Sequence, residues 1–91
     1  MPWSYNATSR IVLPRGEAKM IELKVRFGEN LRSVRKANGF SQEQLAFASG
    51  LDRSYVGKIE RGQINVTLET VNTLAKTLGC SPRELIPDRV E

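Results

Sequence analysis

Two helix boundaries in the middle of the chain lie only a few residues apart, and this spacing constrains the fold more than any other feature. Ser41 begins the sequence Ser-Gln-Glu-Gln, a capping box that is typical of a helix start. Gly50 can end that helix because glycine accepts a positive φ, and Asp52 can cap the N-terminus of the next one. A connection this short is too tight for an antiparallel hairpin and suits two helices that cross at a steep angle.

The residues around this turn meet the steric demands of such a crossing. A small residue is required where the two backbones approach, and Ala46 stands four residues before the turn glycine. Apolar residues must hold the second helix of the pair against the first, and Leu51, Val56 and Ile59 have the required spacing. Each feature is common by itself, but together they predict a helix-turn-helix whose second helix covers about residues 52–60.

The chain from about residue 21 onward has helical periodicity. A first helix is predicted to end at Asn38-Gly39, a fourth to lie between Thr67 and Gly79, and a short fifth to open at Ser81-Pro82. The sequence therefore predicts an all-α domain of five helices over residues 21–91. The apolar stripes of the first and fourth helices consist of Phe27, Leu31, Val34, Val71, Leu74, Ala75 and Leu78.

Residues 1–20 differ from the rest because proline, glycine, asparagine and serine punctuate them. Within them, Arg10–Leu13 is the only stretch that resembles a β-strand. We expect an N-terminal arm that is flexible or pairs as an edge strand on a partner; a disordered tail is the plainer alternative.

Composition limits the chemistry that the chain can perform. Its 91 residues include no histidine and a single cysteine, and the net charge is +4, which suits an anionic partner without requiring one. The lone Cys80 excludes an intrachain disulfide, fits a reducing cytoplasm, and is expected to pack in the core or an interface rather than sense redox state. We expect no enzyme activity, cofactor or metal, because the usual nucleophilic, acid–base and metal-binding combinations are missing. No apolar run has the length of a membrane span.

The predicted third helix carries cations on its outward side. Arg53 can donate two hydrogen bonds to guanine, Ser54 can bond several base edges, and Lys58 can reach a base or a phosphate. Gly57 would let the helix backbone approach the floor of a DNA groove. The alternative is a solvated cationic face, but within this motif base reading is the favoured interpretation. The outward set is Arg53, Ser54, Gly57, Lys58 and Arg61.

Three segments of the chain resemble the Cro/lambda-repressor family of regulators, also called the Xre family. They are Gln42–Ala46, Gly50–Val56 and Ile59–Gly62, and the likeness extends over about residues 27–86. Within that family, the sequence that begins at Asp52 is most similar to controller proteins of restriction–modification systems and to small stand-alone regulators. The resemblance implies a lambda-repressor-like DNA-binding domain.

The resemblance also implies contacts to DNA phosphates by Gln42, Tyr55 and Arg61, with Asn65 as a further one. Gln42 would lie at the N-terminus of the second helix, where free backbone N–H groups and the helix dipole favour an anion. The alternatives are a plain exposed helix start for Gln42 and a partly buried core position for Tyr55.

Two further sets of residues take structural roles by the same resemblance. Arg35 and Glu60 would form a semi-buried ion pair between the first and third helices, with two exposed charges as the alternative. The dimer contact would involve the last helix, at Pro82, Glu84, Leu85 and Ile86.

We therefore expect a homodimeric, cytoplasmic transcriptional regulator that binds a palindromic operator in double-stranded DNA. Dyad symmetry would place two recognition helices about 34 Å apart, in successive major grooves. We expect no small-molecule effector and no membrane partner. An antitoxin-like or other protein-interaction module with a helix-turn-helix fold is the alternative, and it would present a large exposed apolar patch and bind DNA weakly.

Overall fold

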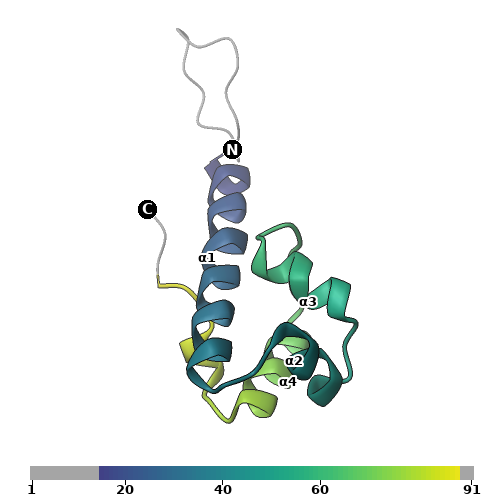
Figure 1. Cartoon of the computed structure of the whole chain (residues 1–91). Helices are drawn as coiled ribbons and strands as arrows, with labels where there is room; N and C mark the ends of the chain where they lie inside the picture. Colours follow the sequence, from purple (N-terminus) through teal and green to yellow (C-terminus); the bar gives the residue numbers. More distant parts are fainter. Residues whose placement is uncertain (1–14, 89–91) are drawn as a thin grey trace, which may run out of the picture.

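The computed structural model describes residues 15–88, with side chains from residue 22 onward. All regular structure in this part of the chain is helical. In Figure 1, α2, α3 and α4 lie on one side of α1, and the first turns of α1 extend beyond them. Four α-helices are followed by one 3-10 helix: α1 Arg15–Ala37, α2 Gln42–Ser49, α3 Arg53–Glu60, α4 Leu68–Leu78 and η1 Pro82–Glu84.

The first helix begins at Arg15, six residues before the start predicted near residue 21. The expected boundary between arm and domain therefore falls inside α1. The residues from Glu17 to Met20 are glutamate, alanine, lysine and methionine, all strong helix formers, and they offset the weak glycine at position 16. The predicted strand at Arg10–Leu13 lies outside the described residues.

Local capping signals fix the starts and ends of the short helices. The Ser41 hydroxyl accepts a bond of 3.0 Å from the Gln44 N–H, and the Gln44 side chain accepts one of 2.8 Å from the Ser41 N–H, which confirms the predicted capping box. Gly50 ends α2 with φ 75°, in the left-handed region that favours glycine. Asp52 occupies the N-cap of α3 as predicted, but its side chain makes no capping hydrogen bond.

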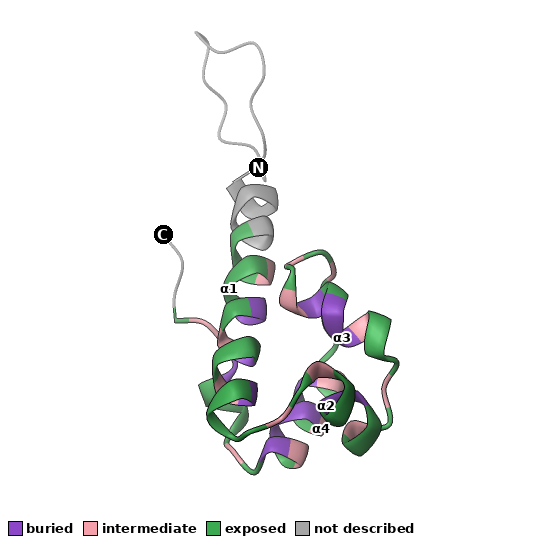
Figure 2. Cartoon of the chain, viewed as in Figure 1, coloured by how far each residue is buried: buried purple, intermediate pink, exposed green. Residues whose placement is uncertain are grey.

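The core lies where the inner faces of the four α-helices and the segment after η1 meet, as the purple ribbon segments in Figure 2 show. Cys80 packs against its edge, and burial together with the charge of Glu84 raises the pKa of its thiol. Across the described residues, we find no helix with the length and apolar character that a bilayer span requires. The buried apolar residues are Phe27, Leu31, Leu45, Ala46, Val56, Ile59, Val71, Leu74, Ala75, Leu78 and Leu85.

The predicted fifth helix is a single 3-10 turn, and this changes the role of Leu85. Pro87 disfavours helical geometry at the preceding residue, so the segment cannot continue as an α-helix. The turn points Leu85 into the core, where it is 0% exposed, and its carbonyl accepts a bond of 3.1 Å from Asn30 Nδ2. Leu85 is thus not available for the predicted dimer contact, whereas Pro82, Glu84 and Ile86 are exposed.

Candidate nucleic-acid interface

The predicted helix-turn-helix is formed by α2, the turn at Gly50 and α3. The Leu51 N–H donates a bond of 2.9 Å to the Ala46 carbonyl, which closes the turn behind α2. Ala46 is buried where the two helices approach, and Val56 and Ile59 hold α3 in the core. Packing therefore fixes the inner face of α3, and helical geometry then determines which residues of α3 face solvent.

The exposed face of α3 carries a positive charge in each of its two turns. Arg53, Ser54 and Lys58 are all exposed, as the helical spacing predicts. Tyr55 is half-buried and packs against the core, which is the alternative position considered for it. The only acidic residue of α3, Glu60, is turned inward, so the outward face presents donors and positive charge to solvent.

Gly57 is buried, contrary to the prediction of an exposed glycine in the centre of this face. The side chain that covers it belongs to Arg61, one helical turn further along. A methyl group at Gly57 would lie 3.0 Å from Arg61 Nη1. The helical spacing placed Gly57 on the correct side of α3, but it could not describe the path of a long side chain across that side.

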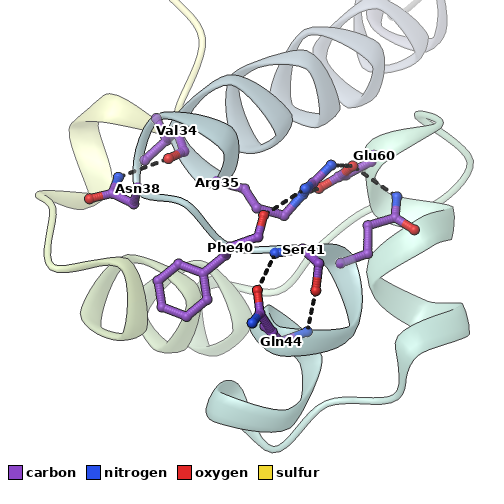
Figure 3. Close-up of polar contacts among 8 residues, drawn as sticks. Val34, Arg35, Asn38, Phe40, Ser41, Gln44 and Glu60 are labelled. Atoms are coloured by element: carbon purple, nitrogen blue, oxygen red, sulfur yellow. Dashed lines mark hydrogen bonds and ion pairs between the residues drawn. The ribbon is translucent and has the colours of Figure 1, made fainter.

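An ion pair between Arg35 of α1 and Glu60 of α3 joins two helices in the interior. Arg35 Nε donates to Glu60 Oε2 at 2.6 Å and Arg35 Nη2 to Oε1 at 3.0 Å, a bidentate geometry. Arg35 Nη1 also donates to the Phe40 carbonyl at 2.8 Å, and Figure 3 shows the guanidinium between these two acceptors. The two side chains are only 8% and 3% exposed, so the pair is more deeply buried than the semi-buried contact expected.

Gln42 completes this network from α2. Its Nε2 donates to Glu60 Oε1 at 2.9 Å, so the carboxylate of Glu60 accepts bonds from α1 and α2 together. Burial by itself raises the pKa of Glu60, but the hydrogen bonds from Arg35 and Gln42 and the charge of Arg35 outweigh burial and hold the pKa below its ordinary value. The sequence interpretation gave Gln42 a phosphate contact and missed this second role.

Gly28 is a further residue that the sequence interpretation missed. It lies in the middle of α1, and a methyl group there would contact the Ile59 carbonyl oxygen and lie 2.7 Å from the Glu60 carbonyl oxygen. The absence of a side chain thus lets α1 approach the backbone at the end of α3. A glycine inside a helical pattern costs about 1 kcal/mol relative to alanine, and that cost was the available signal of a close contact.

An apolar groove lies on the surface between α1, the start of α4 and the chain after η1. Its walls include Leu23, Phe27, Leu68, Ile86 and Pro87, with Asn65 at its edge. Leu68 and Ile86 are 82% and 47% exposed. The groove therefore presents apolar side chains to solvent next to the segment in which the sequence predicts a dimer contact.

Known proteins resemble the chain throughout this region. The profile of the helix-turn-helix family matches residues 31–85. The control protein C.SmaI of Serratia marcescens is 45% identical over 74 residues, which cover 81% of this chain and 88% of that protein. The control protein C.BamHI of Bacillus amyloliquefaciens is 38% identical over 70% of this chain and 80% of its own length. The crystal structure of the restriction–modification controller protein C.AhdI from Aeromonas hydrophila superposes with a TM-score of 0.67 at 55% identity, over 76% of this chain and 98% of that one.

Proposed function

This chain belongs to the helix-turn-helix family of DNA-binding transcriptional regulators, which are not enzymes, and we propose that it acts as a homodimer on a palindromic operator. Its relatives include several restriction–modification control proteins, and the identities of 45% and 55% to two of them support the same task for this chain. A protein with this task works at the bacterial chromosome or a plasmid, so we place it in the cytoplasm.

The observation that carries this proposal is the exposed set Arg53, Ser54 and Lys58 on a helix whose inner face is locked in the core. An α-helix fits the major groove of DNA, where arginine can bond guanine O6 and N7 together. Val56 and Ile59 anchor α3 in the core, so Arg53, Ser54 and Lys58 would enter the major groove of DNA from a fixed backbone.

Phosphate contacts should lie at the edges of this surface. The backbone N–H of Gln42 is in the first turn of α2 and has no intrahelical acceptor, so it can bind a phosphate. The bond from Gln42 to Glu60 uses one amide hydrogen and leaves the second free for the same phosphate. Tyr55 and the exposed Asn65 are further candidates at the rim.

Replacing Arg53 with alanine is expected to weaken binding to the operator by about 1–3 kcal/mol and to remove the preference at one base position. The operator is first selected from a random DNA pool, which also reveals palindromy and half-site spacing. Binding of each variant is then measured on the selected site, on single-base substitutions of it and on scrambled DNA.

Asn65→Ala is the matched control, because Asn65 is exposed and a lost phosphate contact weakens all sequences by a similar factor. Gln42→Ala is less suitable, since it would also remove the bond to Glu60. If Arg53→Ala weakens selected and scrambled DNA equally, Arg53 does not read a base. If the wild-type protein selects no sequence at all, the protein-interaction module becomes the better description of the chain.

We assign the dimer contact to the apolar groove together with Ile86, in place of the buried Leu85. Among the described residues, three of the exposed large apolar side chains, Leu23, Leu68 and Ile86, line this groove, and Ile86 follows Pro82 and Glu84 closely in the chain. A second copy that covers the groove would bury Leu23, Leu68 and Ile86 around a twofold axis.

Ile86→Asp is expected to convert the dimer into a folded monomer, because a carboxylate would be buried without a partner at the contact. Sedimentation should give the mass of one chain, and affinity for the full palindrome should fall toward that of a single half-site. Phe47→Asp is the control, since Phe47 is 90% exposed on α2 and away from the groove. If Ile86→Asp sediments as a dimer, the contact lies elsewhere.

A further inference from the structure

Gly57 and Arg61 together form a feature that base reading by Arg53 does not explain. Glycine is among the weakest helix formers, yet Gly57 lies in the interior of the eight-residue helix α3. The three atoms nearest to a methyl group placed there are all guanidinium atoms of Arg61: Nη1 at 3.0 Å, Cζ at 3.8 Å and Nη2 at 3.9 Å. The guanidinium therefore lies over the glycine, against the outward side of α3.

Helix geometry explains why Arg61 reaches this position. Side chains on an α-helix tilt toward its N-terminus, so a residue covers the turn that precedes its own Cα. Arg61 follows Gly57 by four residues, and a side chain at position 57 would occupy the space that the guanidinium now fills. Arg61 itself is exposed, so the planar group has protein on one side and solvent on the other.

We propose that Arg61 reads a base in the major groove and that Gly57 is the positioning residue that makes room for its guanidinium. This inference rests on the proposed function, in which α3 enters the groove. Arg53, Gly57 and Arg61 are spaced by four residues and form one row along the outward side of the helix. With α3 in the major groove, a guanidinium on this row would face the base edges. To contact a phosphate, it would have to leave the row and extend beyond the side of the helix.

The planar, forked donor set of arginine suits this role. It can donate two parallel hydrogen bonds to guanine O6 and N7, which lysine cannot reproduce. Because the guanidinium lies over Gly57, about 6 Å along the helix axis from the level of Arg53, it would meet a base pair other than the one that Arg53 contacts. The operator should therefore show two separate positions that depend on arginine.

The test compares base preferences of the wild-type protein with those of Arg61→Ala, Arg61→Lys, Gly57→Ala and the Gly57→Ala/Arg61→Ala double variant. We expect Arg61→Ala to lose discrimination about 10-fold or more at one base position, distinct from the position that Arg53→Ala affects. Arg61→Lys should lose the same discrimination and keep its binding to scrambled DNA. Gly57→Ala should reduce the same preference, and the double variant should match Arg61→Ala alone.

Gly57→Ala should still fold, because the atom that a methyl group at Gly57 meets is the end of a flexible side chain. Gly57→Ala should melt at or above the wild-type temperature. If Arg61→Ala weakens all sequences by one factor and lowers the salt dependence by about one unit, Arg61 binds a phosphate and the inference fails. The proposed function still stands in that case if Arg53→Ala keeps its effect on one base. A Gly57→Ala variant with unchanged preference would refute the role given to the glycine.

Discussion

Replacing Glu60 with alanine is expected to lower the free energy of unfolding by about 3 kcal/mol, the largest effect that we predict for a charged residue. The reason is the burial of Arg35, whose side chain is 8% exposed and whose bidentate partner would be removed. The remaining bond from Arg35 to the Phe40 carbonyl cannot neutralise a guanidinium in the interior. Chemical denaturation at neutral pH measures the difference directly.

Glu29→Ala is the matched control for Glu60→Ala, since Glu29 is an exposed glutamate inside α1 and its loss should stay within about 0.5 kcal/mol. The lowered pKa of Glu60 adds a second readout. The stabilisation is complete above the ordinary value of 4.5 and is lost as the pH falls through the lowered pKa. The difference in free energy of unfolding between wild type and Glu60→Ala should therefore become smaller at acidic pH. Equal stability of the two proteins at neutral pH would contradict the prediction.

Gly28→Ala is expected to destabilise the protein by about 2–3 kcal/mol, although alanine is the better helix former. The added methyl group would contact the Ile59 carbonyl oxygen and lie 2.7 Å from the Glu60 carbonyl oxygen. These are backbone atoms, so relief requires α3 to move away from α1. That movement would also stretch the contact between Arg35 and Glu60, and we expect DNA affinity to fall together with stability.

Gly57→Ala provides the comparison for Gly28→Ala, because both glycines lie inside helices and are buried. Only the neighbour differs: a rigid backbone at Gly28 and a flexible arginine at Gly57. The melting temperature of Gly28→Ala should lie below that of the wild type, and that of Gly57→Ala should lie at or above it. If both variants gain stability, α1 and α3 can separate without cost and the close contact has no structural importance.

The features that the sequence predicted well depend on residues close together in the chain. The capping box at Ser41 and Gln44 and the left-handed Gly50 are local, and the structure has both. The helix-turn-helix follows from them because a short connection leaves few ways for two helices to pack. The inward positions Val56 and Ile59 follow from helical periodicity alone.

The features that the sequence did not predict depend on distant partners. Gln42 meets Glu60 across 18 residues, and Gly28 meets the end of α3 across more than 30, so no local pattern describes either contact. The burial of Leu85 was not predicted for a different reason. An apolar residue after Ser81-Pro82 is equally compatible with a helix that faces a partner and with a turn that faces the core, and Pro87 was the signal that favoured the turn.

The network around Glu60 has a consequence for how such a protein can change its target. Three helices are tied together at the last residue of α3, while Arg53 and Ser54 at its first turn are exposed and take no part in the tie. Substitutions at that first turn can therefore accumulate without loss of folding. Gene duplicates could diverge in operator preference one residue at a time, and every intermediate would remain a folded protein on which selection can act.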